Sequence, residues 1–563
     1  MHRNDVQPER GCPHRQEFPV LHRLPNIEEG LSVGFSLRAT TSALRLALLL
    51  LVIPRIAHAQ NGVINVVATG DQIIVSGRCP NPSATIIELA PFETIASAQT
   101  RQPVAFLKGP TDFTIQLPRR QESSDRLYSS FAVIDPATPN RVLGTNRFVE
   151  EFRGLIRNEE LFPIAASKKG LQVQMVDDAL ALGVKHAALN VNLSSLIEVT
   201  NRPGFLRWIR NENEDFYFNS GRVEALDRQV KTLSDSNVVI SLILLSYASS
   251  RADINKLMLH PGYDPKAPNH LGAFNTATAE GVRYLSACFE FLAERYSRKD
   301  RRYGSAVNFI VGNEVNSHWF WYNMGRVSME ELAKHYLRAV RICHTAVRKY
   351  SANSRVYLSL EHHWNMRYPG GDAHQTVAGR KFVDYFNQCA NAQGNFDWHI
   401  AFHPYPENLF NCRTWNDKTA TLRDDTPRIT FKNLEMLSAY LERPELLYHG
   451  APRRVILSEQ GFHSSEKPDG ELLQAAAYAY AYYRVAHLPG IDSFILHRHV
   501  DHPAEGGLHL GLWRRDPASS SFVKKRIYEV FREADRPNWE SAFAFALPLI
   551  GIKSWDDIQP GSP

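Results

Sequence analysis

Beyond residue 160, short apolar runs alternate along the chain with longer stretches in which apolar residues recur at helical spacing. This alternation is typical of parallel βα units. Eight apolar runs are predicted strands: residues 162–166, 186–191, 238–245, 308–312, 356–360, 399–402, 455–457 and 493–496. Predicted helices lie between them, among them residues 171–182, 276–296, 329–350, 377–390, 430–441 and 471–487. Eight units in about 370 residues predict an α/β fold, a (β/α)8 TIM barrel with insertions.

An open doubly wound sheet is the alternative to a closed barrel. That architecture usually carries a glycine-rich phosphate-binding loop after its first strand. Residues 165–170, Ala-Ala-Ser-Lys-Lys-Gly, are a poor version of such a loop. The pattern therefore favours the barrel.

A different pattern precedes the barrel. Between residues 62 and 150, short β-branched runs are broken by turn residues, which predicts a small all-β sandwich. A packing or spacer role is the simpler interpretation of this domain, and sugar binding is the alternative. The predicted organisation is a signal region (1–59), a β-sandwich-like accessory domain (60–150), the (β/α)8 barrel (151–540) and a C-terminal tail (541–563).

The first sixty residues contain one apolar run, residues 43–54. Arg38 and Arg45 stand at its start, and the small residues Ala57 and Ala59 follow it. This pattern predicts a secretory signal cleaved after Ala59, and hence a secreted or periplasmic protein. A membrane anchor is the alternative, but the run is well short of the roughly 20 residues needed to span a bilayer. We therefore expect no stable membrane insertion after cleavage.

Composition narrows the classes of partner. The 563 residues are 44% hydrophobic, enough for a large core. Lys and Arg total 64 against 59 for Asp and Glu, a net charge of +5 that does not suggest nucleic-acid binding. Cleavage would remove Cys12 and leave five cysteines, an odd number that does not indicate a disulfide framework, although a bridge between Cys389 and Cys412 stays open.

Polar residues follow the predicted strands directly. In a barrel, catalytic groups lie at the C-terminal ends of strands. Glu314 ends the fourth predicted strand and Glu459 the seventh. Each carboxylate follows a buried run, where it brings no folding benefit. Two such acids are the minimum equipment for cleaving a glycosidic bond.

With Asn313-Glu314 on strand four, Ser458-Glu459 on strand seven and Tyr405 after strand six, the chain resembles the clan A glycoside hydrolases over roughly residues 160–535. The resemblance implies a retaining hydrolase in which Glu314 is the general acid and base and Glu459 the nucleophile. It also implies that Asn313 binds the sugar 2-hydroxyl and that Tyr405 holds the nucleophile. Strand eight departs from the family pattern, because His497-Arg498-His499 stands where many relatives place a tryptophan, and so does the long loop at residues 246–275.

A carbohydrate substrate needs further contacts at the strand ends. Histidines there are interpreted as hydrogen-bond partners of sugar hydroxyls or of the acids, and aromatic rings as stacking platforms. Arg498 and Arg367 make an anionic sugar a hypothesis, because guanidinium groups suit carboxylates and sulfates. The candidate substrate-binding residues are Asn313, His403, Tyr405, Trp319, Trp364, Asn190, His497 and Arg498.

Two other functions compete with this one. A non-catalytic polysaccharide-binding barrel would keep the aromatic rings without turnover, but the presence of both acids argues against it. A metal-dependent hydrolase would use the histidines of strands five, six and eight. Metal-dependent amidohydrolase barrels typically carry His-x-His on strand one, where residues 163–167 read Pro-Ile-Ala-Ala-Ser. We therefore expect neither a metal nor another cofactor, and the sequence leaves the oligomeric state undetermined.

Overall fold

A computed structural model describes residues 61–108, 112–121, 124–135, 142–516, 518–519 and 521–560. The predicted signal region, residues 1–59, lies outside the described residues. Among those described, no helix combines the length and apolarity needed to cross a membrane. All five cysteines in this part of the chain are free, so Cys389 and Cys412 form no bridge.

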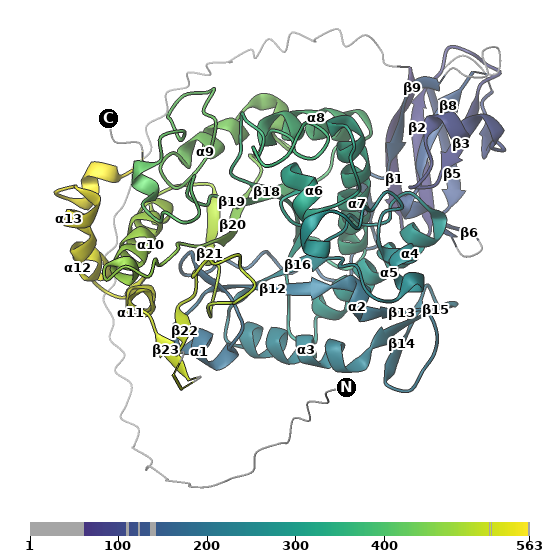
Figure 1. Cartoon of the computed structure of the whole chain (residues 1–563). Coiled ribbons are helices and arrows are strands. Elements are labelled where there is room, and N and C mark those ends of the chain that lie inside the picture. Colours follow the sequence, from purple (N-terminus) through teal and green to yellow (C-terminus); the bar gives the residue numbers. More distant parts are fainter. Residues whose placement is uncertain are drawn as a thin grey trace, which may run out of the picture. The chain divides into compact units, whose positions relative to one another are not determined.

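The N-terminal part folds as two four-stranded sheets, as predicted (Figure 1, purple). Burial alternates along their strands, so that Ile73 and Val75 of β2 are buried while Gln72, Ile74 and Ser76 are partly exposed. The first sheet has the order β10-β1-β2-β5, with bounds Glu151–Arg153, Gly62–Thr69, Gln72–Arg78 and Asp112–Pro118. The second has the order β4-β3-β8-β9, with bounds Ala105–Phe106, Thr85–Leu89, Ser130–Ile134 and Val142–Phe148. Since β10 pairs with β1, the sandwich extends slightly beyond the predicted boundary at residue 150.

Eight parallel strands then close into a barrel, which confirms the predicted fold class of a (β/α)8 TIM barrel preceded by an all-β sandwich. The strands are buried on both faces, as parallel strands covered by helices require. In barrel order they are β11 (Lys169–Gln172), β12 (His186–Asn192), β16 (Val239–Leu245), β17 (Asn308–Val311), β18 (Arg355–Glu361), β19 (Trp398–His403), β20 (Val455–Gln460) and β21 (Ile491–Leu496).

Side chains fill the barrel interior, so it is a packed core. Seven strands each contribute residues to one interior cluster, among them Ala188, Ile243, Ile310, Tyr357, Ala401, Ile456 and Ile495. Helices cover the outside (Figure 1): α1 (Val176–Ala181), α3 (Ser220–Asp235), α4 (Ala252–Met258), α5 (Ala279–Tyr296), α7 (Met329–Arg348), α8 (Gly379–Ala392), α9 (Glu435–Leu441), α10 (Gly470–Ala486) and α11 (Arg526–Glu533). Insertions add α2 (Leu193–Leu196), α6 (His318–Trp321), a sheet of β13 (Ile197–Glu198), β14 (Phe205–Arg210) and β15 (Glu214–Asn219), and a hairpin of β22 (Trp513–Arg515) and β23 (Phe522–Lys524).

The first barrel strand differs from the prediction. Residues 162–166 form no regular structure, and Ile164 is 98% exposed. The strand is instead β11, whose polar ends Lys169 and Gln172 are both buried. The Lys169 amine donates to the Ala534 carbonyl at 2.7 Å, just past α11. Because a lysine is rarely buried, the sequence did not indicate a buried strand here.

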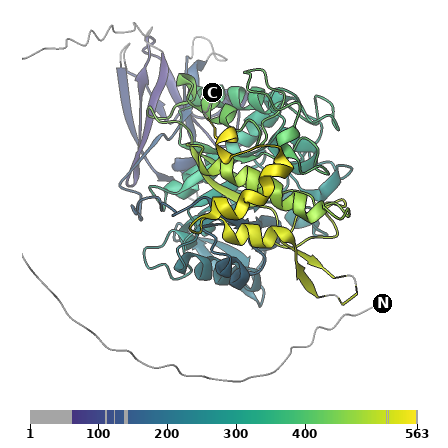
Figure 2. The same ribbon diagram turned by 90° about the vertical axis from the view of Figure 1, so that its left-hand side faces the viewer.

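The predicted C-terminal tail packs against the barrel. It contains α12 (Trp539–Phe543) and α13 (Leu547–Ile550). The ring of Trp555 stacks on Tyr483 of α10, with centroids 5.0 Å apart. Figure 2 shows these yellow helices beside the light-green α10.

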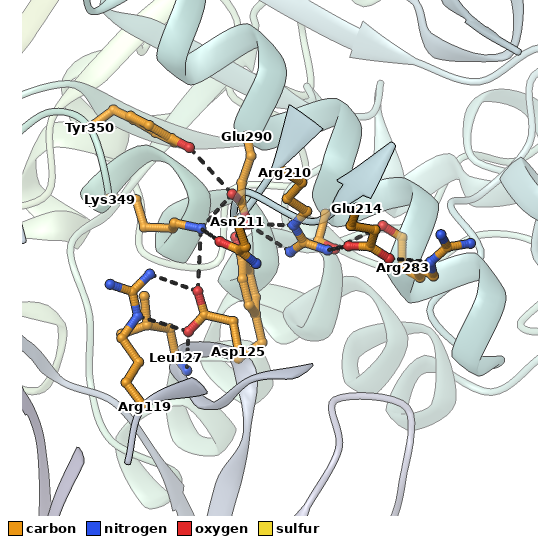
Figure 3. A network of polar contacts seen from close by, with 12 residues as sticks. Arg119, Asp125, Leu127, Arg210, Asn211, Glu214, Arg283, Glu290, Lys349 and Tyr350 are labelled. Carbon is orange, nitrogen blue, oxygen red and sulfur yellow. Dashed lines mark hydrogen bonds and ion pairs between the residues drawn. The ribbon is translucent and has the colours of Figure 1, made fainter. Parts of the chain in front are cut away.

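A buried network of charged groups joins the sandwich to the barrel (Figure 3). At its centre is Glu290 of α5, which is 0% exposed. Its carboxylate accepts hydrogen bonds from Arg210 at 2.6 Å and from the Tyr128 hydroxyl of the sandwich at 2.7 Å. Lys349 bridges Glu290 and Asp125, the latter on the sandwich side at 3.3 Å. The described residues form one compact unit, in keeping with this buried connection.

Candidate active site

Glu314 lies on a tight turn immediately after β17. Gly312 has φ 74° and Glu314 itself φ 41°, both in the left-handed region. A Cβ on Gly312 would come within 2.7 Å of the Tyr322 ring, so the turn needs glycine there. The backbone N–H of Glu314 donates to Ser359 Oγ at 3.0 Å, which fixes the turn to the next strand of the barrel.

The Glu314 carboxyl is buried beside His403, the last residue of β19. Glu314 Oε1 and His403 Nδ1 are 2.9 Å apart, and His403 Nε2 lies 3.0 Å from Ser458 Oγ. Burial raises the pKa of Glu314, while the hydrogen bond and charge of His403 lower it in part, and the net direction is upward. Burial lowers the pKa of His403, but Glu314 and Glu459 outweigh it and raise the value. His403 is 2% exposed, so it positions Glu314 instead of facing solvent.

Glu459 lies near the end of β20 and is half-buried. The Tyr405 hydroxyl donates to Glu459 Oε1 at 3.2 Å. Burial, and then the charge of Glu459, raises the pKa of Tyr405 well above its ordinary value, so this phenol remains a donor. Carboxyl oxygens of Glu314 and Glu459 and a ring nitrogen of His403 lie within 4.8 Å of one another. Such an approach of one oxygen from each glutamate is compatible with the roughly 5 to 5.5 Å between the carboxyl groups of retaining glycosidases.

A cavity of about 480 Å³ opens beside Glu459, a size typical of small-molecule sites. Five of the residues predicted from the sequence line it: Asn190, Asn313, Glu459, His497 and Arg498. Among the other residues that line it, Gln172, Tyr247 and Glu505 were not predicted, and Trp321 belongs to the aromatic run at residues 318–322. Glu314, His403 and Tyr405 reach the cavity only through their contacts with one another and with Glu459.

One wall of the cavity is an ionic cluster. Arg498 donates to Glu505, and His497 Nε2 lies 3.6 Å from the same carboxylate. Burial opposes ionisation of Glu505, but His497 and Arg498 outweigh it and lower its pKa to about 2. The positive charge of Arg498 is therefore compensated within the protein. Arg367 is exposed, donates to the Gly371 carbonyl and does not line the cavity.

The two predicted tryptophan platforms do not line the cavity. Trp364 is 2% exposed and packs edge-on against Phe402 and Tyr440, so no face of its ring is available to a sugar. Trp319 of α6 is partly buried and lies outside the cavity, whereas Trp321, from the same aromatic run, lines it. The aromatic wall is therefore supplied by Trp321 and Tyr247.

Two groups of side chains have the spacing of metal ligands among the described residues. The first is Glu361, His362 and His363 at the end of β18. The Glu361 carboxylate already accepts hydrogen bonds from Asn316 at 2.7 Å, from Ser317 at 3.0 Å and from the His363 ring at 2.6 Å. Both oxygens of the Glu361 carboxylate are thus already engaged as acceptors within the protein.

The second group is Glu314, His403 and Glu459. Both ring nitrogens of His403 are already engaged, one with Glu314 and one with Ser458. The corrected first strand, Lys-Gly-Leu-Gln, also carries no histidine. These internal bonds suit a pair of acids better than a metal centre.

The cavity residues that were not predicted differ in how far the sequence could have indicated them. Gln172 ends the true first strand and was lost with the misplaced strand. Tyr247 stands just after β16, so position alone could have suggested it, and Trp321 belongs to the aromatic run at residues 318–322 whose rings were interpreted as stacking platforms. Glu505 lies in the loop after β21, and nothing in its local sequence marks it.

Comparison with known proteins places these features in context. No curated protein matches the chain. Matching solved structures include a hyperthermophilic β-glucosidase from Pyrococcus furiosus, with 16% identity, coverage of 66% of this chain and 86% of that chain, and a TM-score of 0.43. A family 39 glycoside hydrolase from Bacteroides cellulosilyticus WH2 has 13% identity, coverage of 83% and 80%, and a TM-score of 0.41. A family 1 β-glucosidase from Thermotoga maritima has 11% identity, coverage of 63% and 84%, and a TM-score of 0.39.

These names belong to the class that the sequence resembles, but the low identities and TM-scores carry no argument about activity. The function has to be argued from the site itself. A family model matches residues 162–558, nearly the whole barrel and the C-terminal helices. The chain belongs to this family, a family of unknown function, DUF5722.

Proposed function

We propose that this protein is a retaining glycoside hydrolase that cleaves glycosidic bonds of a poly- or oligosaccharide by double displacement. The observation that carries the proposal is the placement of Glu314 and Glu459, with carboxyl oxygens within 4.8 Å of each other. The two acids also differ in environment. Burial raises the pKa of Glu314, which favours its protonated form, and the Tyr405 hydroxyl donates a hydrogen bond to Glu459.

In the first displacement, a Glu459 oxygen attacks the anomeric carbon of the sugar in the cavity. The bond from that carbon to the glycosidic oxygen breaks, and its electron pair goes to the leaving oxygen, which takes the proton of Glu314. A covalent glycosyl-enzyme and an ionised Glu314 result. Tyr405 keeps Glu459 in place for the attack.

In the second displacement, ionised Glu314 takes a proton from a water molecule. The water oxygen attacks the anomeric carbon, and the bond to Glu459 breaks with its electron pair returning to the carboxylate. Two inversions leave the configuration of the anomeric carbon unchanged. Both acids regain their starting protonation states, and no cofactor takes part.

The cavity favours a neutral sugar over a uronate or a sulfated one. Arg498 would have to bind such an anion, but its guanidinium is already paired with Glu505. With Glu459 and Glu505 both carboxylates, the wall carries no excess positive charge. Neutral hydroxyls suit the amide groups of Asn190 and Gln172, and the ring of Trp321 suits the apolar face of a pyranose.

The proposal includes export. On the sequence pattern around Ala59, the mature protein begins at Gln60 and acts in the periplasm or outside the cell. N-terminal sequencing of the protein recovered from the periplasm or the medium checks this, and an intact Met1 in that fraction would contradict it.

The test of catalysis is reducing-sugar release by the chain from Gln60 onward, with neutral, uronate-containing and sulfated polysaccharides. We expect release from a neutral polymer, and a loss of about 10² to 10⁴-fold in both Glu314→Gln and Glu459→Gln. Glu224→Gln, an exposed glutamate on α3, is the matched control and should keep full activity. Proton NMR of the first product should show the anomer of the substrate.

Other outcomes point to the competing functions. Binding without release from any polymer would indicate the non-catalytic barrel. Activity abolished by a chelator would indicate the metal-dependent hydrolase. Full activity in either glutamate variant would contradict the proposed mechanism.

A further inference from the structure

A second and larger space lies on the same face of the barrel as the cavity. It is a groove of about 1020 Å³ built from the loops that follow β11, β20 and β21. These loops stand at the C-terminal ends of three adjacent strands, where barrel enzymes hold their substrates. No step proposed above uses this groove.

The groove and the cavity adjoin each other. Gln174 lines both of them. Arg498 and Glu505 line the cavity, and Val500 and Gly507, each two residues further along the same loop, line the groove. One loop therefore separates the two spaces, and a ligand longer than one sugar would pass from one to the other.

The position of the two acids gives this path a direction. Glu459 lines the cavity and Glu314 does not, so the sugar whose anomeric carbon is attacked occupies the cavity and the leaving group departs on the side of Glu314. Glu314 follows β17, which stands opposite β21 in the eight-stranded barrel. The groove, around β11, β20 and β21, therefore adjoins the cavity on the side away from the leaving group.

The walls of the groove carry the chemistry that binds sugars. Phe522 of β23 is 46% exposed, with the Arg515 guanidinium 5.4 Å from its ring centroid. Within the described residues Arg515 forms no ion pair, so its donors are available to hydroxyls. His509 adds a second flat ring, with His463 behind it at 5.5 Å between centroids. Aromatic faces beside unpaired polar groups suit pyranose rings, which are apolar on their faces and polar at their edges.

We propose that this groove binds the glycan chain on the non-reducing side of the cleaved bond, so that the protein holds several sugar units ahead of that bond and does not trim single terminal sugars. The inference rests on the proposed function, because Glu459 as nucleophile defines which sugar occupies the cavity. The occupant is a neutral oligosaccharide chain, since acidic and basic side chains are both present in the groove.

The test measures binding in a protein that does not turn over. Calorimetry with Glu459→Gln, from Gln60 onward, uses mono- to hexasaccharides of the cello-, xylo-, manno- and laminari- series. In at least one series we expect the affinity to rise by more than about tenfold with chain length. Adding Phe522→Ala or Arg515→Ala should remove most of that gain while leaving the affinity for the monosaccharide unchanged.

Phe106→Ala is the control, because Phe106 is also a solvent-exposed phenylalanine and lies on β4 of the sandwich. It should leave the gain intact. An affinity that does not change with length, a gain that survives both groove variants, or no binding in any series would overturn the inference.

Hydrolysis by the wild-type protein separates the two proposals. Turnover of short aryl glycosides without any effect of chain length would keep the hydrolase and remove the groove as a binding site. Length-dependent binding that the groove variants abolish, without turnover of any substrate, would keep the groove and remove the hydrolase.

Discussion

At the scale of residues, the site separates two glutamates of the same chemistry by their surroundings. Glu314 is buried, in left-handed backbone, against His403. Glu459 is half-buried, faces the cavity and accepts from Tyr405. Burial raises the pKa of Glu314, so its surroundings favour the protonated form that a general acid needs. Left-handed backbone is costly for a residue other than glycine, so the turn at Glu314 stores strain where the proposed chemistry takes place.

His403 tunes this difference, and His403→Ala tests it. Its hydrogen bond and charge lower the pKa of Glu314, while burial and the neighbouring carboxylates raise it. Without the imidazole only the raising effects remain, so Glu314 keeps its proton to higher pH. Because protonated Glu314 is the active form, the alkaline limb of kcat/KM should move to higher pH. We also expect kcat to fall by about ten- to a hundredfold, since the acid loses its anchor.

A matched variant separates this role from mere packing. Ser359→Ala removes the acceptor of the Glu314 backbone N–H without touching the carboxyl, so it should lower stability and leave the alkaline limb in place. His403→Gln keeps a side-chain amide near Glu314 and should lie between the wild type and His403→Ala. A limb that stays still in His403→Ala would show that His403 does not set the protonation of Glu314.

The two acids could be found from the sequence, but most of the cavity lining could not. Glu314 and Glu459 directly follow apolar runs, and in a barrel that position alone implies the catalytic face. Glu505 comes from a loop and is held by Arg498 and His497. That contact exists only in the folded chain. The prediction for Trp364 was wrong for a different reason. An aromatic ring after a strand packs into the helix layer as readily as it faces a substrate, and Trp364 packs against Tyr440.

At the scale of elements, the barrel strands could be recognised in the sequence as apolar runs, because they are buried on both faces. Most helices were equally clear, since α5, α7, α8 and α10 fall close to their predicted bounds, but the helix predicted over residues 171–182 is only α1, because Leu171 and Gln172 belong to β11. Strand β11 is the exception, because Lys169 and Gln172 are polar and buried. Their hydrogen-bond partners lie elsewhere in the sequence: Lys169 donates to the Ala534 carbonyl beyond α11, and Gln172 donates to the Asn190 side chain of β12. A strand whose polar groups are satisfied by distant segments leaves no local pattern to recognise.

At the scale of the whole molecule, the sandwich is tied to the barrel by buried charges. Glu290 accepts from Arg210 of the barrel and from Tyr128 of the sandwich, and Lys349 bridges it to Asp125 (Figure 3). A domain joined to the barrel only by a flexible linker would not require such buried contacts. The structure thus makes the sandwich a structural part of the barrel, which agrees with the packing role expected from the sequence.

Glu290→Gln tests this connection. Burial opposes ionisation of Glu290, but Arg210 and Lys349 outweigh it and lower its pKa to about 2. A carboxylate with a depressed folded-state pKa stabilises the protein above its unfolded value, about 4.3, and this contribution is lost as the pH falls toward 2. Removing the charge leaves Arg210 and Lys349 buried with one partner fewer. We expect the free energy of unfolding to fall by about 3 to 5 kcal/mol at pH 7.

Urea denaturation of the wild type and of Glu290→Gln at several pH values measures the difference, which should shrink steadily below about pH 4.3. Glu294→Gln is the control on the same helix. Glu294 accepts from the neutral Trp208 indole at 2.9 Å, and a glutamine oxygen accepts as well, so its cost should stay within about 1 kcal/mol. A Glu290→Gln loss that does not change with pH would assign the effect to packing. No loss at all would mean that the network does not hold the sandwich to the barrel.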